Sequence, residues 1–140
     1  MSEFVDHLIR VRYAETDKMR IVYYANYFVY FEIGRVEYMR RRGLDYSRME
    51  IEDDCFTVVA EATCRYLSPA RFDDPLRIRT QITSAKSRVI RFGYEILHDE
   101  SKALLVTGET IHVICGSDGK PKILPEKYRP YFDFKSIQTE

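Results

Sequence analysis

One stretch near the start of this 140-residue chain has the pattern of a long helix. Between Ala25 and Arg42 there is no proline, and Gly34 is the only glycine. Apolar or small residues recur three or four positions apart, at Tyr27, Tyr30, Phe31, Gly34 and Tyr38. This spacing predicts one helix whose apolar stripe is wide enough to be wrapped by other elements, rather than laid on a surface.

The sequence on either side of that helix is rich in β-forming residues. We expect one strand before it, over residues 7–14, ending near Glu15. Four more strands should follow, over residues 55–66, 76–84, 89–97 and 103–114. Polar connectors between them predict turns, so the strands should pair antiparallel, hairpin to hairpin. Residues 50–54 are interpreted as loop, and residues 125–130 as a short helical turn at most.

The predicted order of elements is therefore a strand, one long helix and four strands. Such an order favours an α+β layer arrangement in which one curled antiparallel sheet buries the helix. A length of 140 residues is common for one domain and leaves little room for a second core. We expect residues 1–140 to form a single domain.

Charge and cysteine content exclude several classes of protein. Lysine plus arginine and aspartate plus glutamate number 22 each, so no excess charge draws the whole protein to nucleic acid or an anionic membrane. There is no apolar run of about 18 residues and no signal-peptide pattern, which predicts a soluble, cytoplasmic protein without membrane insertion. Cys55, Cys64 and Cys115 are widely spaced in apolar text and are interpreted as small buried hydrophobes.

A carboxylate just before the predicted helix is the main candidate for chemistry. Asp17 precedes the aromatic segment Tyr23, Tyr24 and Ala25, where the helix should begin with unpaired backbone N–H groups. An acid can attack or accept a proton, and helix-start amides can hold a carbonyl oxygen, as ester and thioester hydrolysis require. Composition alone also allows a structural Asp in a turn.

The residues around Asp17 resemble a known family. The segment from Arg12 to Phe28, with its motif Asp17-x-x-x-x-Val22-Tyr23-x-x-Asn26-Tyr27, is similar to hotdog-fold acyl-CoA thioesterases of the 4-hydroxybenzoyl-CoA thioesterase type. That group includes small bacterial acyl-CoA thioester hydrolases linked to the Tol-Pal envelope system. The resemblance runs from about residue 7 to about residue 132. It implies a five-stranded antiparallel sheet wrapped round the helix, subunits that join sheets edge to edge as a homodimer or homotetramer, an acyl-CoA substrate and no cofactor.

The resemblance also implies roles for particular residues. Asp17 would act as nucleophile or general base, and the backbone amide of Tyr24 would polarise the thioester carbonyl. Tyr23 and Tyr27 could contact substrate or pack in the core or the dimer interface, and Asn26 could cap the helix or hydrogen-bond in the site. Glu61, on a strand expected to face the substrate across the dimer, could be a further polar group or a buried structural acid.

Two positions depart from the family pattern. Several relatives have His where this chain has Tyr24, so an imidazole base there is excluded. Relatives commonly have Gly at the position of Arg20, which predicts a turn with positive φ that Arg adopts only at a cost. Arg20 could alternatively reach solvent or the coenzyme phosphates.

A neutral protein that binds CoA still needs a local basic site. Lys86, Ser87, Arg88 and Arg91 match a basic hairpin that lies near the nucleotide in relatives, although a solvated turn is an equal interpretation. The three histidines lack metal-ligand spacing, so no metal is expected.

Other functions stay open at this point. A non-catalytic acyl-CoA sensor, an envelope-complex adaptor and an acyl-carrier-protein thioesterase each fit the pattern in part. A hotdog dehydratase would need a His-centred site, which the Asp17 segment lacks. The acyl group, aliphatic or aromatic, is undetermined.

Overall fold

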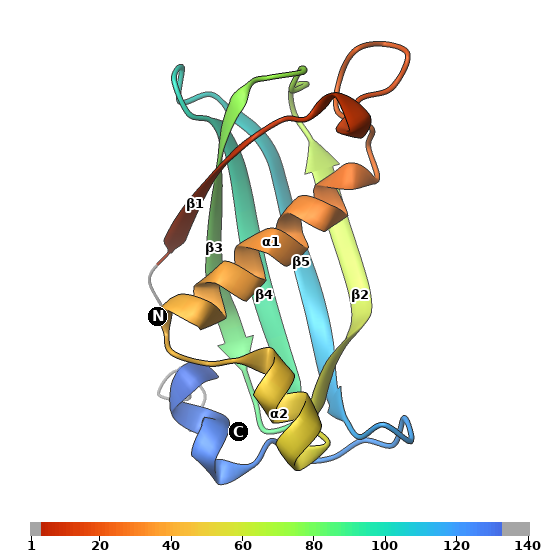
Figure 1. The fold of residues 1–140 in the computed structure, drawn as a ribbon, viewed down its shortest axis with the longest axis vertical. Helices are drawn as coiled ribbons and strands as arrows, with labels where there is room; N and C mark the ends of the chain where they lie inside the picture. The colour runs from red at the N-terminus through yellow and green to blue at the C-terminus, as the bar shows by residue number, and fades with distance from the viewer. Residues whose placement is uncertain (1–3, 133–140) are drawn as a thin grey trace.

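A five-stranded antiparallel sheet with one long helix across its face forms the body of the protein (Figure 1). The computed structural model describes residues 4–132, so residues 1–3 and 133–140 of the predicted domain lie outside the described part. The elements are β1 (Val5–Arg10), α1 (Asn26–Arg41), α2 (Tyr46–Asp53), β2 (Phe56–Tyr66), β3 (Pro75–Ala85), β4 (Val89–His98) and β5 (Leu104–Cys115), with 3-10 turns at Tyr13–Glu15 and Glu126–Phe132. The predicted α+β architecture is confirmed.

The strands lie in the order β1-β3-β4-β5-β2, and every neighbouring pair is antiparallel. Hairpins join β3 to β4 and β4 to β5, as predicted. The prediction of a hairpin between β2 and β3 is wrong, because β2 pairs with β5 and the connection 67–74 crosses to the far side of the sheet (Figure 1). As a result, β1 and β2 form the two edges.

The long helix packs closely on the sheet through its smallest residue. A Cβ atom at Gly34 would lie 2.7 Å from Ile78 Cγ2, so only glycine fits there without movement. One turn earlier, the ring of Phe31 stacks on Tyr94 with centroids 4.3 Å apart. All the stripe residues named in the sequence prediction are buried, which confirms that the sheet wraps the helix.

Two local predictions are wrong. The first strand ends at Arg10, opposite Pro75, rather than near Glu15. Past this pair, Val11 bonds to Asp73 and Asp74 in the turn before β3, where Asp73 has φ of 68°. The chain then enters the 3-10 turn Tyr13–Glu15 instead of extending the strand. Residues 50–54, predicted as loop, lie mostly in α2. Asp45 caps that helix through a hydrogen bond from Ser47 N–H to its carboxylate (2.9 Å).

Candidate active site

The loop before α1 holds Asp17 in a tight turn. The carbonyl of Asp17 accepts from Arg20 N–H (2.9 Å), and its own N–H donates to Ile21 O (2.9 Å). Arg20 has φ of 66°, the left-handed conformation that closes such a turn, so the positive φ expected at this position is confirmed. One carboxylate oxygen of Asp17, Oδ1, accepts from Met19 N–H at 2.8 Å. Within residues 4–132 the other oxygen, Oδ2, accepts no hydrogen bond and is available to react.

Backbone bonds on both sides fix the segment that links this turn to the helix. Val22 N–H donates to Ala70 O (2.8 Å), and Tyr23 N–H donates to Glu15 O (2.9 Å). The carboxylate of Glu15, largely buried, accepts from the hydroxyl of Tyr30 in α1 (2.9 Å). The turn is therefore attached both to the helix and to the segment that precedes β3.

The helix start leaves backbone donors unused. Asn26 N–H is taken by Tyr23 O (2.8 Å), but in the described part of the chain the N–H groups of Tyr24 and Ala25 have no partner. Such groups carry the positive end of the helix dipole. The hydroxyl of Tyr66 donates to Tyr24 O (3.0 Å) and so orients the peptide between Tyr24 and Ala25. Burial raises the pKa of Tyr66 to about 12, which keeps this hydroxyl protonated as a donor.

A hollow of about 340 Å³, which we call the inner hollow, brings these groups together. Its wall is mostly apolar, and it joins the turn, the helix start and the end of β2. The lining residues are Asp17, Ile21, Val22, Tyr24, Tyr27, Tyr66, Leu67, Ser68 and Pro69. A hollow of this size and polarity suits a small apolar group, with a carboxylate at its wall.

The remaining residues predicted around Asp17 occupy different environments. Tyr27 is buried and lines the inner hollow, whereas Tyr23 is exposed and does not. Asn26 is not a helix cap, because Ala25 holds the cap position and no side chain caps α1. Asn26 Nδ2 is buried and, among the described residues, has no hydrogen-bond partner. Glu61 is exposed on the edge strand β2, so the buried structural interpretation of this residue is wrong.

The predicted CoA-binding residues lie at the other end of the same subunit. The turn that carries Lys86 and Arg88 follows the last residue of β3, whereas the Asp17 turn lies beside the first (Figure 1). Eleven strand residues separate these ends, a span of about 33 Å at about 3.3 Å per residue. Arg91 pairs with Glu109 at 3.5 Å. A single subunit therefore does not bring Lys86, Ser87, Arg88 or Arg91 to Asp17.

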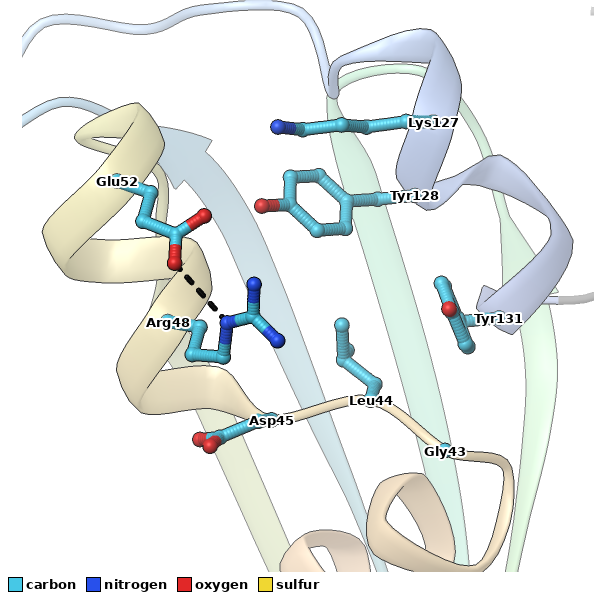
Figure 2. A pocket seen from close by; sticks show the side chains of 8 residues that line it. All are labelled: Gly43, Leu44, Asp45, Arg48, Glu52, Lys127, Tyr128 and Tyr131. Carbon is cyan, nitrogen blue, oxygen red and sulfur yellow. Dashed lines mark hydrogen bonds and ion pairs between the residues drawn. The ribbon is translucent and has the colours of Figure 1, made fainter.

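A second hollow, of about 230 Å³, lies at that other end, between α2 and the C-terminal 3-10 turn (Figure 2). Its charged groups are paired among themselves or with neighbours. Arg48 bonds Glu52 at 2.9 Å, and Lys127 bonds Asp53 at 2.9 Å. These pairs leave little for a ligand to bind.

Tyr66 and the residues after it were missed as site residues from the sequence. Tyr66, Leu67, Ser68 and Pro69 form one wall of the inner hollow although they stand 42 or more positions after Tyr24. Pro69, three residues after β2 ends at Tyr66, was the available signal, since proline is rare inside strands and loop residues next to a strand end can face a site.

Comparison with known proteins agrees with this geometry. The family model described as the thioesterase-like superfamily matches residues 11–131. The chain belongs to this family. An acyl-CoA thioester hydrolase, YbgC of Escherichia coli, is 35% identical over 120 residues, which is 84% of this chain and 87% of the relative.

Solved structures extend the comparison. A probable thioesterase from Bartonella henselae superposes with a TM-score of 0.81 at 33% identity, covering 87% of this chain and 99% of that one. A 4-hydroxybenzoyl-CoA thioesterase mutant in complex with 4-hydroxybenzoyl-CoA has a TM-score of 0.84, over 94% of this chain and 99% of that one. Its identity is 18%, so it shows the fold alone. The predicted hotdog fold is confirmed.

Three further features bear on the class of protein. Among residues 4–132, no helix combines the length and apolarity needed to cross a bilayer. Within the same range, no three His, Cys, Asp or Glu side chains are grouped so as to hold a metal ion. All three cysteines are free, with Cys55 and Cys115 buried as predicted and Cys64 half-buried.

Proposed function

We propose that this protein hydrolyses acyl-CoA thioesters to a carboxylic acid and free CoA. One observation carries the proposal: Asp17, with an unbonded carboxylate oxygen, and Tyr24, with an unused N–H, line the same apolar hollow. The relatives named as acyl-CoA thioester hydrolases and thioesterases support the choice of substrate class.

Two routes use the same groups. In the nucleophilic route, Asp17 Oδ2 attacks the thioester carbon, the C–S bond breaks, the thiolate leaves with the electron pair, and water hydrolyses the resulting anhydride. In the general-base route, Asp17 takes a proton from water while the hydroxide adds to the carbonyl carbon; the C–S bond then breaks, the thiolate leaves with the electron pair, and the proton held by Asp17 returns to it or to solvent. In both, the carbonyl oxygen gains negative charge, which the Tyr24 N–H at the positive end of α1 stabilises. Of the predicted substrate-binding residues, Tyr27 forms part of the acyl wall. Asn26 stands next to it in the chain, but its buried amide does not line the inner hollow. Tyr23 and Glu61 would contact substrate only in an assembly that encloses them.

A homodimer would bring the basic hairpin to the active site. The edge strand β2 exposes apolar side chains, including Val58 and Val59, and its unpaired edge can continue the sheet of a second copy. Two-fold pairing of β2 edges runs antiparallel, so the turn with Lys86, Ser87, Arg88 and Arg91 of the partner subunit lies at the same end as Asp17. We place the CoA phosphates near that turn, in a homodimer or in a homotetramer built from it.

We also infer a cytoplasmic location. Three unpaired thiols, two of them buried, suit a reducing compartment, where disulfides are rare.

The test of the proposed function is hydrolysis of a panel of acyl-CoAs by the purified protein, with a thiol reagent to detect free CoA. The panel should include short aliphatic, long aliphatic and aromatic acyl groups, because the inner hollow does not fix the length of the chain. Turnover of at least one class at a kcat/KM above about 10⁴ M⁻¹s⁻¹ is expected of an enzyme on its own substrate. Inactivity on the whole panel would refute the proposal.

A further inference from the structure

Glu15 is a largely buried acid that the two proposed routes do not use. Its side chain is 10% exposed, and burial of a carboxylate costs stability unless the carboxylate is hydrogen-bonded. Glu15 Oε1 accepts from the hydroxyl of Tyr30 and from Arg12 N–H, both at 2.9 Å, and Oε2 accepts from Arg12 Nε at 3.2 Å. Donors from the start of the 3-10 turn and from α1 therefore hold this carboxylate in one place.

The main chain of Glu15 belongs to the small ladder that carries the two proposed reacting groups. Asp17, two residues after Glu15, lies on one side of this ladder, and Tyr23 and Tyr24 continue the other side. Tyr23 N–H donates to Glu15 O at 2.9 Å. Of the bonds across the ladder, this one is nearest in the chain to the free N–H of Tyr24.

Tyr30 fastens this end of the ladder to the helix. It lies in the second turn of α1, is fully buried, and packs edge to face on Tyr27 with ring centroids 5.7 Å apart. Burial and the hydrogen bond to Glu15 raise the pKa of Tyr30, so its hydroxyl stays protonated as a donor. A reacting group on a loop is held less precisely than one on a helix or strand, unless surrounding hydrogen bonds support it.

We propose that Glu15 and Tyr30 are positioning residues for thioester hydrolysis, and that their hydrogen bond, which we call the clamp, fixes the Asp17 turn against the start of α1. This inference rests on the proposed function. Neither side chain lines the inner hollow. Loss of the clamp should therefore slow the reaction and leave substrate binding unchanged, because small misplacements of reacting groups lower the rate steeply.

The test is Tyr30→Phe, which keeps the buried ring and removes the hydroxyl. It should lower kcat for the best acyl-CoA about tenfold, with KM within about twofold of wild type. Glu15→Gln is the conservative variant, since its side-chain oxygen still accepts from Tyr30 and from Arg12 N–H. It should keep kcat within about threefold of wild type.

Tyr94→Phe is the matched control. Tyr94 is also buried, stacks on Phe31 of α1, and shares a hydrogen bond with Thr110 Oγ1 at 2.6 Å. This variant should lower the thermal unfolding midpoint about as much as Tyr30→Phe does and keep kcat. Unchanged kcat in Tyr30→Phe, or an equal loss of kcat in Tyr94→Phe, would overturn the inference. An equal loss in Glu15→Gln would also overturn it, because Glu15 would then act through its charge.

Amide hydrogen exchange makes the same comparison without substrate. Tyr23 N–H is bonded to Glu15 O, whereas Val22 N–H is bonded to Ala70 O at 2.8 Å and serves as the internal reference. Tyr30→Phe should speed exchange at Tyr23 about fivefold or more relative to Val22, and Tyr94→Phe should leave this ratio unchanged. An unchanged ratio in Tyr30→Phe would overturn the clamp even in an active enzyme. A raised ratio in a protein that hydrolyses no acyl-CoA would confirm the clamp and refute the proposed function.

Discussion

The two ends of the long helix each present an aspartate with the same local bond. At the N-terminal end, Asp17 Oδ1 accepts from the N–H two residues on at 2.8 Å. At the C-terminal end, Asp45 Oδ1 accepts from the N–H two residues on at 2.9 Å and caps α2. Around Asp45 the charges are paired, as Arg48 is with Glu52 in Figure 2. Around Asp17, the side chains of Lys18 and Arg20 have no ion pair and the N–H groups of Tyr24 and Ala25 have no hydrogen-bond partner among residues 4–132.

This contrast separates structural polar groups from groups available to a ligand. Unpaired polar groups cost stability when they are buried and gain little when they are exposed, so folding alone does not favour them. The charges next to Asp45 are paired with one another, whereas the groups next to Asp17 remain available to a ligand. Three of the four predictions below compare a residue at the Asp17 end with a similar residue elsewhere, and one concerns a buried histidine.

The largest expected effect is on catalysis. Asp17→Asn should lower kcat by at least about 100-fold on the best acyl-CoA, because the amide can neither attack nor accept a proton. The turn should survive, since an Asn side-chain oxygen still accepts from Met19 N–H. Release of free thiol and the thermal unfolding midpoint should be measured on the same samples.

Asp45→Asn is the matched control for that substitution. It keeps the same kind of acceptor at the start of α2 and should leave kcat within about twofold, with a stability change below about 1 kcal/mol. Equal activity of wild type and Asp17→Asn would remove Asp17 from the mechanism, even if the protein proved to be a thioesterase.

The second prediction concerns the pH dependence of stability and a buried histidine of β5. His112 is buried, with Nε2 2.8 Å from Thr110 Oγ1 and Nδ1 3.3 Å from Thr57 O. Burial and the charge of Arg35 lower its pKa to about 4 from 6.5. The folded state thus binds this proton less readily than the unfolded state, and the stabilising contribution is complete above pH 6.5 and is lost as the pH falls towards 4. The slope reaches about 1.4 kcal/mol per pH unit between these values.

Urea unfolding at several pH values tests this against His112→Gln, which cannot titrate. The variant is expected to be less stable near pH 7 and to lose less stability than wild type between pH 6.5 and 4. The carboxylates are shared by both proteins, so their contribution cancels in the difference. Parallel stability curves for the two proteins would contradict the assignment of a neutral, buried His112.

The sequence predicted the features that depend on local pattern. The spacing of aromatic residues predicted α1, and the strands fall within a few residues of their predicted positions. The α2 helix was missed because Met49 is its only buried residue, so its sequence has almost no apolar periodicity. The place of β2 at the sheet edge was missed because it depends on pairing with β5, some fifty positions later, and local turn signals do not report such pairing.

The residues of the candidate site divide in the same way, into those that one continuous segment contains and those that strand pairing brings together. Asp17, Tyr24 and the positive φ of Arg20 belong to one continuous segment, so its motif could indicate them. Tyr66 was not predicted, because its contact with Tyr24 O forms only when β2 ends beside the start of α1. The distance of Lys86 from Asp17 likewise depends on the direction of β3, which composition cannot reveal.

The third prediction tests the hydrogen bond from Tyr66. Tyr66→Phe removes one donor to Tyr24 O and should lower kcat about fivefold with little change in KM, the effect of losing a bond worth about 1 kcal/mol. Tyr128→Phe is its counterpart at the other end, where the hydroxyl donates to Asp53. That variant should lose stability by a similar amount and keep kcat. If KM and kcat fall together in Tyr66→Phe, or if neither changes, the claim that Tyr66 positions the Tyr24–Ala25 peptide is wrong.

The smallest effect separates strain from function at Arg20. Glycine adopts positive φ freely, so relief of strain in Arg20→Gly should raise the unfolding midpoint by about 3 °C. The greater conformational freedom of glycine in the unfolded chain offsets part of this gain. The same variant should raise KM for acyl-CoA, because it removes an exposed cation three residues from Asp17. Lys102 has φ of 64° in the turn between β4 and β5 and does not line the inner hollow, so Lys102→Gly should give a similar gain in stability with no change in KM. If both glycine variants gain stability and only Arg20→Gly binds acyl-CoA more weakly, the strain at Arg20 is kept for binding. If KM is unchanged in both variants, substrate binding does not explain the positive φ of Arg20. The contrast between the two ends of the molecule then rests on Asp17 and the helix-start amides alone.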